Sequence, residues 1–238
     1  MHVETVGSGP RLVLVHGSGG NAGWPAQRPL AEHYTLVMPA RSGYPPNPPK
    51  EHIDFEEQAD ELLDVLEPGD HLLGHSYGAV VSMLAAPGAK LLSLAVLEPP
   101  AFGVARGHPA VERTMAELAP LWPANVPPEE FLRRFVEAVG SEYNAPSPLP
   151  SATEAAVRAL MVERAPWEAE IPLDVLAAAP YAKLVVSGSH NAAFDAICDA
   201  LAAGLGAERR VVPGAGHSIP RAPGFNGVLV DFLERATR

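Results

Sequence analysis

The sequence predicts an α/β fold built on one mostly parallel central sheet with helices on both faces. Short runs that are almost wholly apolar, such as residues 11–15 and 91–97, have the composition of strands buried on both faces. Segments with helical spacing of apolar residues follow several of these runs, for example residues 192–205 after the run at 183–187. Alternation of strands and helices is typical of a parallel sheet covered on both sides.

Composition is that of a globular chain with a sizeable core. The chain has 238 residues, 47% of them apolar and 19% charged, which is compatible with one large domain. The formal net charge of -11 disfavours nucleic acid and anionic membranes as partners. No apolar run approaches the length of a membrane span, and residues 1–7 lack the features of a signal peptide. We therefore expect a cytoplasmic protein with a small-molecule substrate, and its oligomeric state stays open.

The single cysteine, Cys198, excludes an intrachain disulfide. It lies in an apolar helical pattern, which predicts a core position rather than a nucleophile. No Cys/His cluster has zinc spacing, and neither phosphate-loop pattern is present. The sequence thus implies no metal and no cofactor.

The first elements are predicted as two strands around a turn. Residues 2–6 alternate and meet a Gly-Ser-Gly-Pro turn, which predicts a hairpin with the strand at 11–15. A second buried strand is predicted at 34–38. Asp54, with Glu57 three residues later, has the pattern of a capping box and predicts the start of a helix.

The middle of the chain changes character. Residues 101–180 contain no convincing strand and hold three helix-like stretches between proline clusters, at 109–119, 128–140 and 151–165. We interpret residues 101–180 as a helical cap or lid inserted into a core domain formed by residues 1–100 and 181–238. The core resumes with predicted strands and helices at 183–187, 192–205, 209–212 and 225–235.

The pattern Gly-x-Ser-x-Gly at residues 74–78 is the strongest motif. It lies between an apolar run at 70–73, predicted as a strand, and a run of small residues at 79–86, predicted as a helix. A serine on a sharp turn from strand to helix exposes its hydroxyl, and small neighbours let the chain reverse tightly. Ser76 is therefore a candidate nucleophile.

Three segments together resemble the α/β-hydrolase superfamily. They are His-Gly-Ser-Gly-Gly at 16–20, the Gly-His-Ser-Tyr-Gly motif at 74–78, and Gly-Ala-Gly-His at 214–217, which follows the last predicted strand. The segment 39–44 is a degraded match to the Asp-x-Arg-Gly-x-Gly pattern of the family. The resemblance spans nearly the whole chain. The helical insertion at residues 101–180 is the part that it explains least.

The resemblance implies roles for particular residues. Ser76 is the expected nucleophile and His217 the expected general base, since an imidazole titrates near neutrality. The backbone N–H groups of Tyr77 and Ser18 are the expected oxyanion hole. His16 and His75 are expected to be structural.

The acid of the triad is where the sequence departs from the family pattern. The usual Gly-x-x-Asp segment reads Gly-Ser-His-Asn at 188–191, and Asn191 cannot stabilise an imidazolium as a carboxylate does. We favour Glu98, at the end of the strand predicted at 91–97, because some branches of the superfamily take their acid from that strand end. Asp195 is the alternative. A Ser–His dyad, or Asn191 orienting His217, remains open.

The function expected from these residues is hydrolysis of a small, partly apolar ester or related acyl compound by a serine hydrolase of the carboxylesterase type. Candidate substrate-binding residues are Gly17, Trp24, Tyr44, Phe102 and Trp122. The loop at 16–24 is also similar to that of carbon–carbon-bond hydrolases, and lyases and haloperoxidases share the scaffold. A non-catalytic small-molecule binder is the alternative of a different class, favoured by Asn191.

Overall fold

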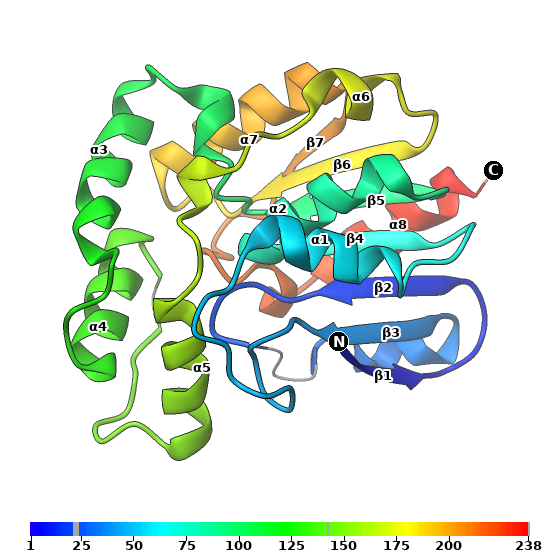
Figure 1. Cartoon of the computed structure of the whole chain (residues 1–238). Helices are drawn as coiled ribbons and strands as arrows, with labels where there is room; N and C mark the ends of the chain where they lie inside the picture. The colour runs from blue at the N-terminus through cyan, green and yellow to red at the C-terminus, as the bar shows by residue number, and fades with distance from the viewer. Residues whose placement is uncertain (21–23, 142, 238) are drawn as a thin grey trace.

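A seven-stranded sheet forms the centre of the molecule (Figure 1). The computed structural model describes residues 1–20, 24–141 and 143–237. In space the strands follow the order β1-β3-β2-β4-β5-β6-β7, and every neighbouring pair is parallel except β1 with β3. The strands are β1 (His2–Val6), β2 (Arg11–Val15), β3 (Thr35–Ala40), β4 (His71–His75), β5 (Ser93–Leu97), β6 (Ala182–Ser187) and β7 (Glu208–Val211). The predicted fold class, α/β with a mostly parallel sheet, is confirmed.

The first strand is where predicted, but its predicted partner is wrong. β1 pairs antiparallel with β3, with His2 opposite Ala40, and makes no hairpin with β2. Both edges of β2 are occupied, by β3 on one side and β4 on the other. β1 therefore pairs along the outer edge of β3, a pairing that local sequence patterns do not reveal.

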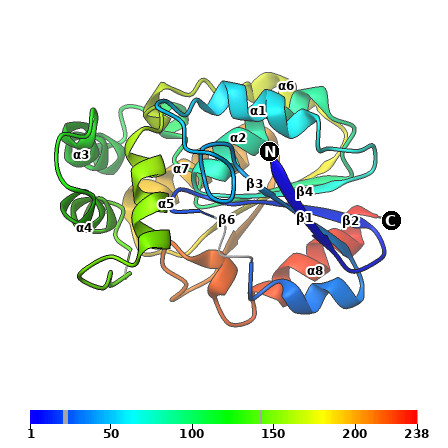
Figure 2. The same cartoon turned by 60° about the horizontal axis from the view of Figure 1, so that its bottom comes forward.

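Helices cover both faces of the sheet, as Figure 2 shows. One face packs against α1, α2 and α7, and the other against α8. Asp54 caps α1 by accepting hydrogen bonds from the N–H groups of Glu56 and Glu57. The helices of these two layers are α1 (Phe55–Leu63), α2 (Tyr77–Ala85), α7 (Ala192–Leu205) and α8 (Phe225–Ala236).

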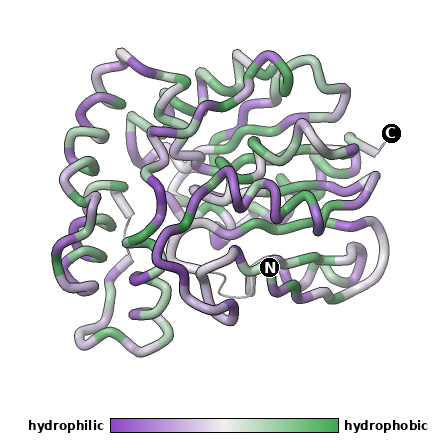
Figure 3. The backbone as a smooth tube through the Cα atoms, in the orientation of Figure 1, coloured by the Kyte–Doolittle hydropathy of each residue, from purple (hydrophilic) through white to green (hydrophobic). Residues whose placement is uncertain are grey.

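The core follows the central strands, along which hydrophobic stretches can be seen in Figure 3. All five residues of β5 are buried, as are the last four of β2. Cys198 is a residue of α7, and its side chain is fully buried in the core, as predicted. No helix in the described part of the chain combines the length and the apolar character needed to cross a bilayer.

Three further helices, α3 (Pro109–Leu118), α4 (Pro128–Ala138) and α5 (Ser151–Met161), stand together beyond one end of the sheet (Figure 1). They lie within the stretch expected to form a helical insertion. A fourth helix of that stretch, α6 (Leu173–Ala178), packs beside α7. The segment after α5 meets the core at a parallel bridge between Ile53 and Glu163.

Candidate active site

Ser76 lies on the turn between β4 and α2, as the motif predicts. Its backbone has a positive φ of 52°, a conformation that a residue with a side chain adopts at a cost and that is found at functional sites. The flanking glycines are needed for space. A Cβ on Gly74 would lie 2.6 Å from the Cα of Ala79, and one on Gly78 would lie 2.3 Å from the carbonyl oxygen of His16.

His217 comes to Ser76 from the loop after β7. Its Nε2 lies 2.9 Å from Ser76 Oγ, a hydrogen-bond distance. The N–H at Nε2 of His75 donates to the backbone carbonyl of His217 over 2.7 Å and so anchors that loop to the end of β4. Two residues 141 positions apart are thereby brought into contact by parallel strands that end at the same edge of the sheet.

Glu98 follows β5 and is wholly buried. Its Oε2 lies 3.3 Å from Nδ1 of His217, and its Oε1 accepts a 2.6 Å hydrogen bond from the N–H of Gly188. The backbone of Glu98 also has a positive φ, 47°. Hydroxyl, imidazole and carboxylate therefore stand in the order needed to move a proton from Ser76 to His217 and to stabilise the resulting imidazolium.

The side chains of the other candidates for the third position of the triad, Asp195 and Asn191, bond to other groups. The carboxylate of Asp195 accepts a 2.5 Å hydrogen bond from the hydroxyl of Ser187 and lies 3.6 Å from the guanidinium of Arg209. Asn191 caps α7, where its side-chain oxygen accepts from the N–H of Ala193. Neither side chain has a recorded hydrogen bond to His217 in the described parts of the chain.

Burial sets the charge states of the site. Removal from water, together with the neighbouring His190, lowers the pKa of His217 to about 3. The ring is therefore neutral at neutral pH, and its Nε2 can accept a proton. Burial raises the pKa of Glu98 to about 7, against the opposing hydrogen bond from Gly188. Burial also lowers the pKa of His75 to about 3, which keeps this anchoring ring neutral.

Two backbone N–H groups near Ser76, those of Tyr77 and Ser18, have no hydrogen-bond partner among the described residues. That of Tyr77 opens α2, where the first N–H groups of a helix have no internal partner. That of Ser18 lies in the loop after β2. Among the residues described, neither N–H donates a recorded hydrogen bond. Gly17 lets this loop approach, because a Cβ there would lie 2.8 Å from the Cβ of Ser76.

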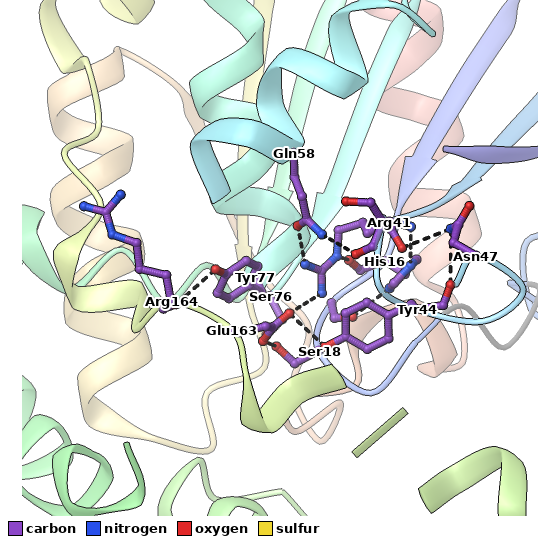
Figure 4. Close-up of polar contacts among 12 residues, drawn as sticks. His16, Ser18, Arg41, Tyr44, Asn47, Gln58, Ser76, Tyr77, Glu163 and Arg164 are labelled. Atoms are coloured by element: carbon purple, nitrogen blue, oxygen red, sulfur yellow. Dashed lines mark hydrogen bonds and ion pairs between the residues drawn. The ribbon is translucent and has the colours of Figure 1, made fainter. Parts of the chain in front are cut away.

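A buried polar cluster around Glu163 anchors the loop that contains Ser18 (Figure 4). The hydroxyl of Ser18 donates to Oε2 of Glu163 over 2.5 Å. The other oxygen of Glu163 accepts from the guanidinium of Arg41 over 2.7 Å and from the hydroxyl of Tyr44 over 2.8 Å. Arg41 in turn donates to the backbone carbonyl of His16 and to the side chain of Gln58.

A cavity of about 510 Å³ opens at Ser76 and His217. Its core-side wall includes the loop at 16–20. Its opposite wall comes from the α4 and α5 region and is mostly apolar, with side chains Leu132, Phe135, Val136, Val139, Val157 and Leu160. A second, much smaller hollow of about 20 Å³ adjoins Ser76 on the side of Tyr77. Such a volume accommodates a group of about the size of one water molecule.

The predicted substrate-binding residues divide between these spaces. Gly17 and Trp24 line the large cavity, and Phe102 and Trp122 line the small hollow. Tyr44 lines neither and belongs to the Glu163 cluster. Residues 21–23 of the loop compared with carbon–carbon-bond hydrolases lie outside the described residues.

One group of possible metal ligands converges within residues 1–20, 24–141 and 143–237. It consists of Glu98, His190 and His217, whose ligand atoms all lie within 4.8 Å of one another. Two of these three side chains already contact each other in the Ser–His–Glu arrangement. A metal there would compete for the Nδ1 atom of His217 that faces Glu98.

Comparison with known proteins identifies the family. The model of the alpha/beta hydrolase family matches residues 12–225, and the chain belongs to this family. Pimeloyl-[acyl-carrier protein] methyl ester esterase of Aeromonas salmonicida (strain A449) is 39% identical over 84 residues, and the match covers 34% of this chain and 33% of that protein. The chain thus matches about a third of that relative's length.

Solved structures of similar fold cover nearly the whole chain. An alpha/beta hydrolase from Sphaerobacter thermophilus DSM 20745 is 25% identical, with a TM-score of 0.67 over 97% of this chain and 95% of that one. The N-acyl homoserine lactonase AidH, with N-butanoyl homoserine bound, is 18% identical, with a TM-score of 0.75 over 99% and 93%. The second likeness shows the fold alone.

One polar side chain of the site, Glu163, was not singled out from the sequence. His190, one of four histidines that the sequence allows to meet at one site, lies one position before Asn191. Glu163 follows α5. Nothing in the local pattern around it indicates that it reaches Arg41 across 122 positions.

Proposed function

We propose that the chain is a serine hydrolase that cleaves a carboxylic ester through an acyl-enzyme on Ser76. The observation that supports this most directly is the continuous contact from Ser76 Oγ to Nε2 of His217 and from its Nδ1 to Glu98. The neutral imidazole accepts the hydroxyl proton as the oxygen attacks the ester carbonyl. Glu98 then stabilises the imidazolium, which returns the proton to the leaving alcohol. Water repeats the sequence to release the acid.

The carbonyl oxygen becomes an oxyanion in this step. The N–H groups of Ser18 and Tyr77 are the proposed donors, since both adjoin Ser76 and neither has a recorded partner within the described residues. Losing one such donor in other hydrolases costs roughly 10²–10³ in turnover. Their fixed position makes them effective without reorganisation as charge develops.

The large cavity and the small hollow beside Ser76 support an ester substrate whose acyl and alcohol parts differ in size. A bulky apolar arm fits the cavity of about 510 Å³, and an arm of about methyl size fits the hollow of about 20 Å³. The partial similarity to a methyl ester esterase agrees with a small arm. We therefore infer that the preferred esters join a medium apolar chain to a methyl-sized group.

The proposal is tested with p-nitrophenyl esters from acetate to octanoate, using wild type and Ser76→Ala side by side. Turnover that depends on Ser76, and labelling by a fluorophosphonate that Ser76→Ala abolishes, is the expected result. Two isomeric esters, methyl hexanoate with its long chain on the acyl side and pentyl acetate with its long chain on the alcohol side, then show which arm of the substrate occupies the large cavity. Labelling without ester turnover would favour carbon–carbon-bond hydrolysis or a lyase. Absence of both would favour a non-catalytic binder.

A further inference from the structure

Arg221 lines the large cavity beside Ser76 from the segment between β7 and α8. It is an exposed residue that ends η6 (Ile219–Arg221), a single turn of 3₁₀ helix. The backbone next to it is held in place, because Nε2 of the buried Gln27 donates a 2.7 Å hydrogen bond to the carbonyl oxygen of Pro220. The side chain of Arg221 therefore starts from an anchored piece of backbone at the cavity.

The guanidinium of Arg221 has no recorded ion pair or hydrogen bond within the described residues. Most other arginines of the described chain form ion pairs with carboxylates. The chain has 28 acidic residues against 17 lysines and arginines, so carboxylates are in surplus. An arginine that meets none of them, although it carries five N–H donors, is available to an anion that enters the cavity.

The cavity contains no negative charge to oppose Arg221. Its lining in the described parts of the chain includes no aspartate, no glutamate and no lysine. The three lining histidines are neutral or positive in either protonation state, so none of them adds a negative charge. An acidic protein thus has a cavity whose electrostatic sign is positive, and Arg221 is the lining residue that is charged at every working pH.

The charge of Arg221 reaches the catalytic end of the cavity. Burial is the main cause of the lowered pKa of His75, and the positive charge of Arg221 contributes to it. His75 directly precedes Ser76 in the motif. The wall from α4 and α5 is mostly apolar, and a cleft with apolar walls and charge of one sign concentrates the field inside it. The cavity therefore attracts an anionic substrate group and repels a cationic one.

We propose that Arg221 binds a carboxylate carried by the larger part of the ester, so that the preferred substrates are esters with an apolar chain that ends in an anion. The chain lies along the wall from α4 and α5, and its carboxylate accepts hydrogen bonds from the guanidinium, whose fork matches a carboxylate with two parallel bonds. This inference rests on the proposed serine hydrolase function and names the chemical class of its substrate. Arg221 selects the substrate and takes no part in the proton transfers at Ser76.

The test uses esters that differ only at the far end of the chain. Monomethyl adipate carries its carboxylate on the acyl side, and its isomer 5-acetoxypentanoate carries it on the alcohol side. The neutral counterpart of each is the ester in which an amide replaces the carboxylate, which keeps the size and polarity of that end without its charge. The measured quantity is the ratio of kcat/KM for the anionic ester to kcat/KM for its amide, in wild type, Arg221→Gln and Arg221→Lys.

Arg221→Gln should lower this ratio by about tenfold for at least one of the two isomers, as expected for a charged hydrogen bond at a partly exposed site. Arg221→Lys should retain part of the ratio, because it keeps the charge and loses the fork. The matched control is Arg113→Gln, since Arg113 is an exposed residue of α3 that lines neither space beside Ser76. It removes the same charge and should leave the ratio as in wild type. An unchanged ratio in Arg221→Gln for both isomers, or an equal fall in Arg113→Gln, would overturn the proposal.

Binding without turnover separates this inference from the proposed function. Isothermal titration calorimetry of Ser76→Ala with the two anionic esters is expected to show binding that the double variant Ser76→Ala, Arg221→Gln weakens by about tenfold. Such binding in a protein whose wild type hydrolyses none of the esters would overturn the hydrolase function and leave the anion site standing. Hydrolysis of methyl hexanoate or pentyl acetate that depends on Ser76, with no effect of Arg221→Gln on the ratio, would leave the hydrolase standing and overturn the anion site. Neither binding nor hydrolysis would overturn both.

Discussion

Glu98 and Glu163 are two buried carboxylates that flank Ser76, and their partners differ in kind. Glu163 is 2% exposed and meets the guanidinium of Arg41, with hydroxyls from Tyr44 and Ser18. Glu98 is 0% exposed and meets imidazoles and one backbone N–H. An arginine is charged at every working pH, whereas an imidazole gains and loses its proton near neutrality. The first carboxylate is therefore suited to holding structure and the second to moving protons.

The largest expected effect is on catalysis at Glu98. Glu98→Gln keeps the shape of the side chain but removes the charge that stabilises the imidazolium of His217, so we expect kcat to fall by about 10⁴-fold. The matched control is Asp195→Asn, which should stay within about tenfold of wild type because Asp195 bonds to Ser187 instead. Steady-state kinetics on one ester suffices. The reverse ranking of the two variants would assign the acid to Asp195.

Glu163→Gln should act on stability instead. The change leaves the fully buried guanidinium of Arg41 without a counter-charge, and breaking such a pair costs roughly 3–5 kcal/mol in free energy of unfolding. Urea denaturation measures this loss. The double variant Arg41→Met, Glu163→Met removes both charges and should lose less than Glu163→Gln alone. A single variant as stable as wild type would contradict the role assigned to this ion pair.

The next prediction concerns the pH dependence of the unfolding free energy, compared between wild type and Glu98→Gln. The pKa of Glu98 is raised by folding from an unfolded value of 4.5 to about 7. A raised pKa stabilises the fold below pH 4.5, and this contribution is lost as pH rises through about 7. Wild type should therefore lose up to about 3 kcal/mol relative to Glu98→Gln between pH 5 and pH 8.

His75 and His217 titrate in the opposite sense. Burial lowers the pKa of each from 6.5 to about 3, so their contribution is present above pH 6.5 and is lost as pH falls toward 3. Because both histidines remain in Glu98→Gln, comparing the two proteins at each pH isolates the carboxylate. An unfolding free-energy difference that does not change from pH 5 to pH 8 would refute the raised pKa.

The smallest expected effect is at the contact between Ser18 and Glu163. Ser18→Ala removes the hydroxyl but keeps the backbone N–H that is the proposed oxyanion donor. The loop loses one buried hydrogen bond, worth about 1 kcal/mol, so kcat should fall by about tenfold or less with KM nearly unchanged. A fall as large as that of Glu98→Gln would mean that the hydroxyl itself takes part in the chemistry.

Much of the architecture could be predicted from local patterns. Apolar runs located the strands, and helical spacing located the ends of α3, α4 and α5 to within four residues. The Gly-x-Ser-x-Gly pattern placed Ser76 on its turn because close backbone contacts there admit only glycine. The partner of β1 was wrong, since pairing depends on which sheet edges remain open after the other strands assemble.

The site was less predictable because its contacts join distant segments. Chain order and the family resemblance favoured Glu98 as the acid, with Asp195 as the alternative and a dyad or Asn191 left open, and only the structure gives the distances of these side chains to other groups. His190 lies 3.7 Å from Glu98 across 92 positions, and Glu163 forms an ion pair with Arg41 across 122 positions. No periodicity or motif encodes such pairs, which arise when parallel strands bring their ends to one edge of the sheet.

The positions of the two glutamates along the chain have a consequence for recombining this enzyme with its relatives. Glu98 is the residue at which the backbone leaves the sheet toward α3, and Glu163 stands where it returns, at the bridge to Ile53. A chimera that exchanges the helices between them would retain the first carboxylate when the upstream crossover falls after Pro100. It would bring a foreign residue against Arg41 unless the downstream crossover falls before Glu163. Workable crossover points thus lie inside this interval, and Arg41 must be inherited together with Glu163.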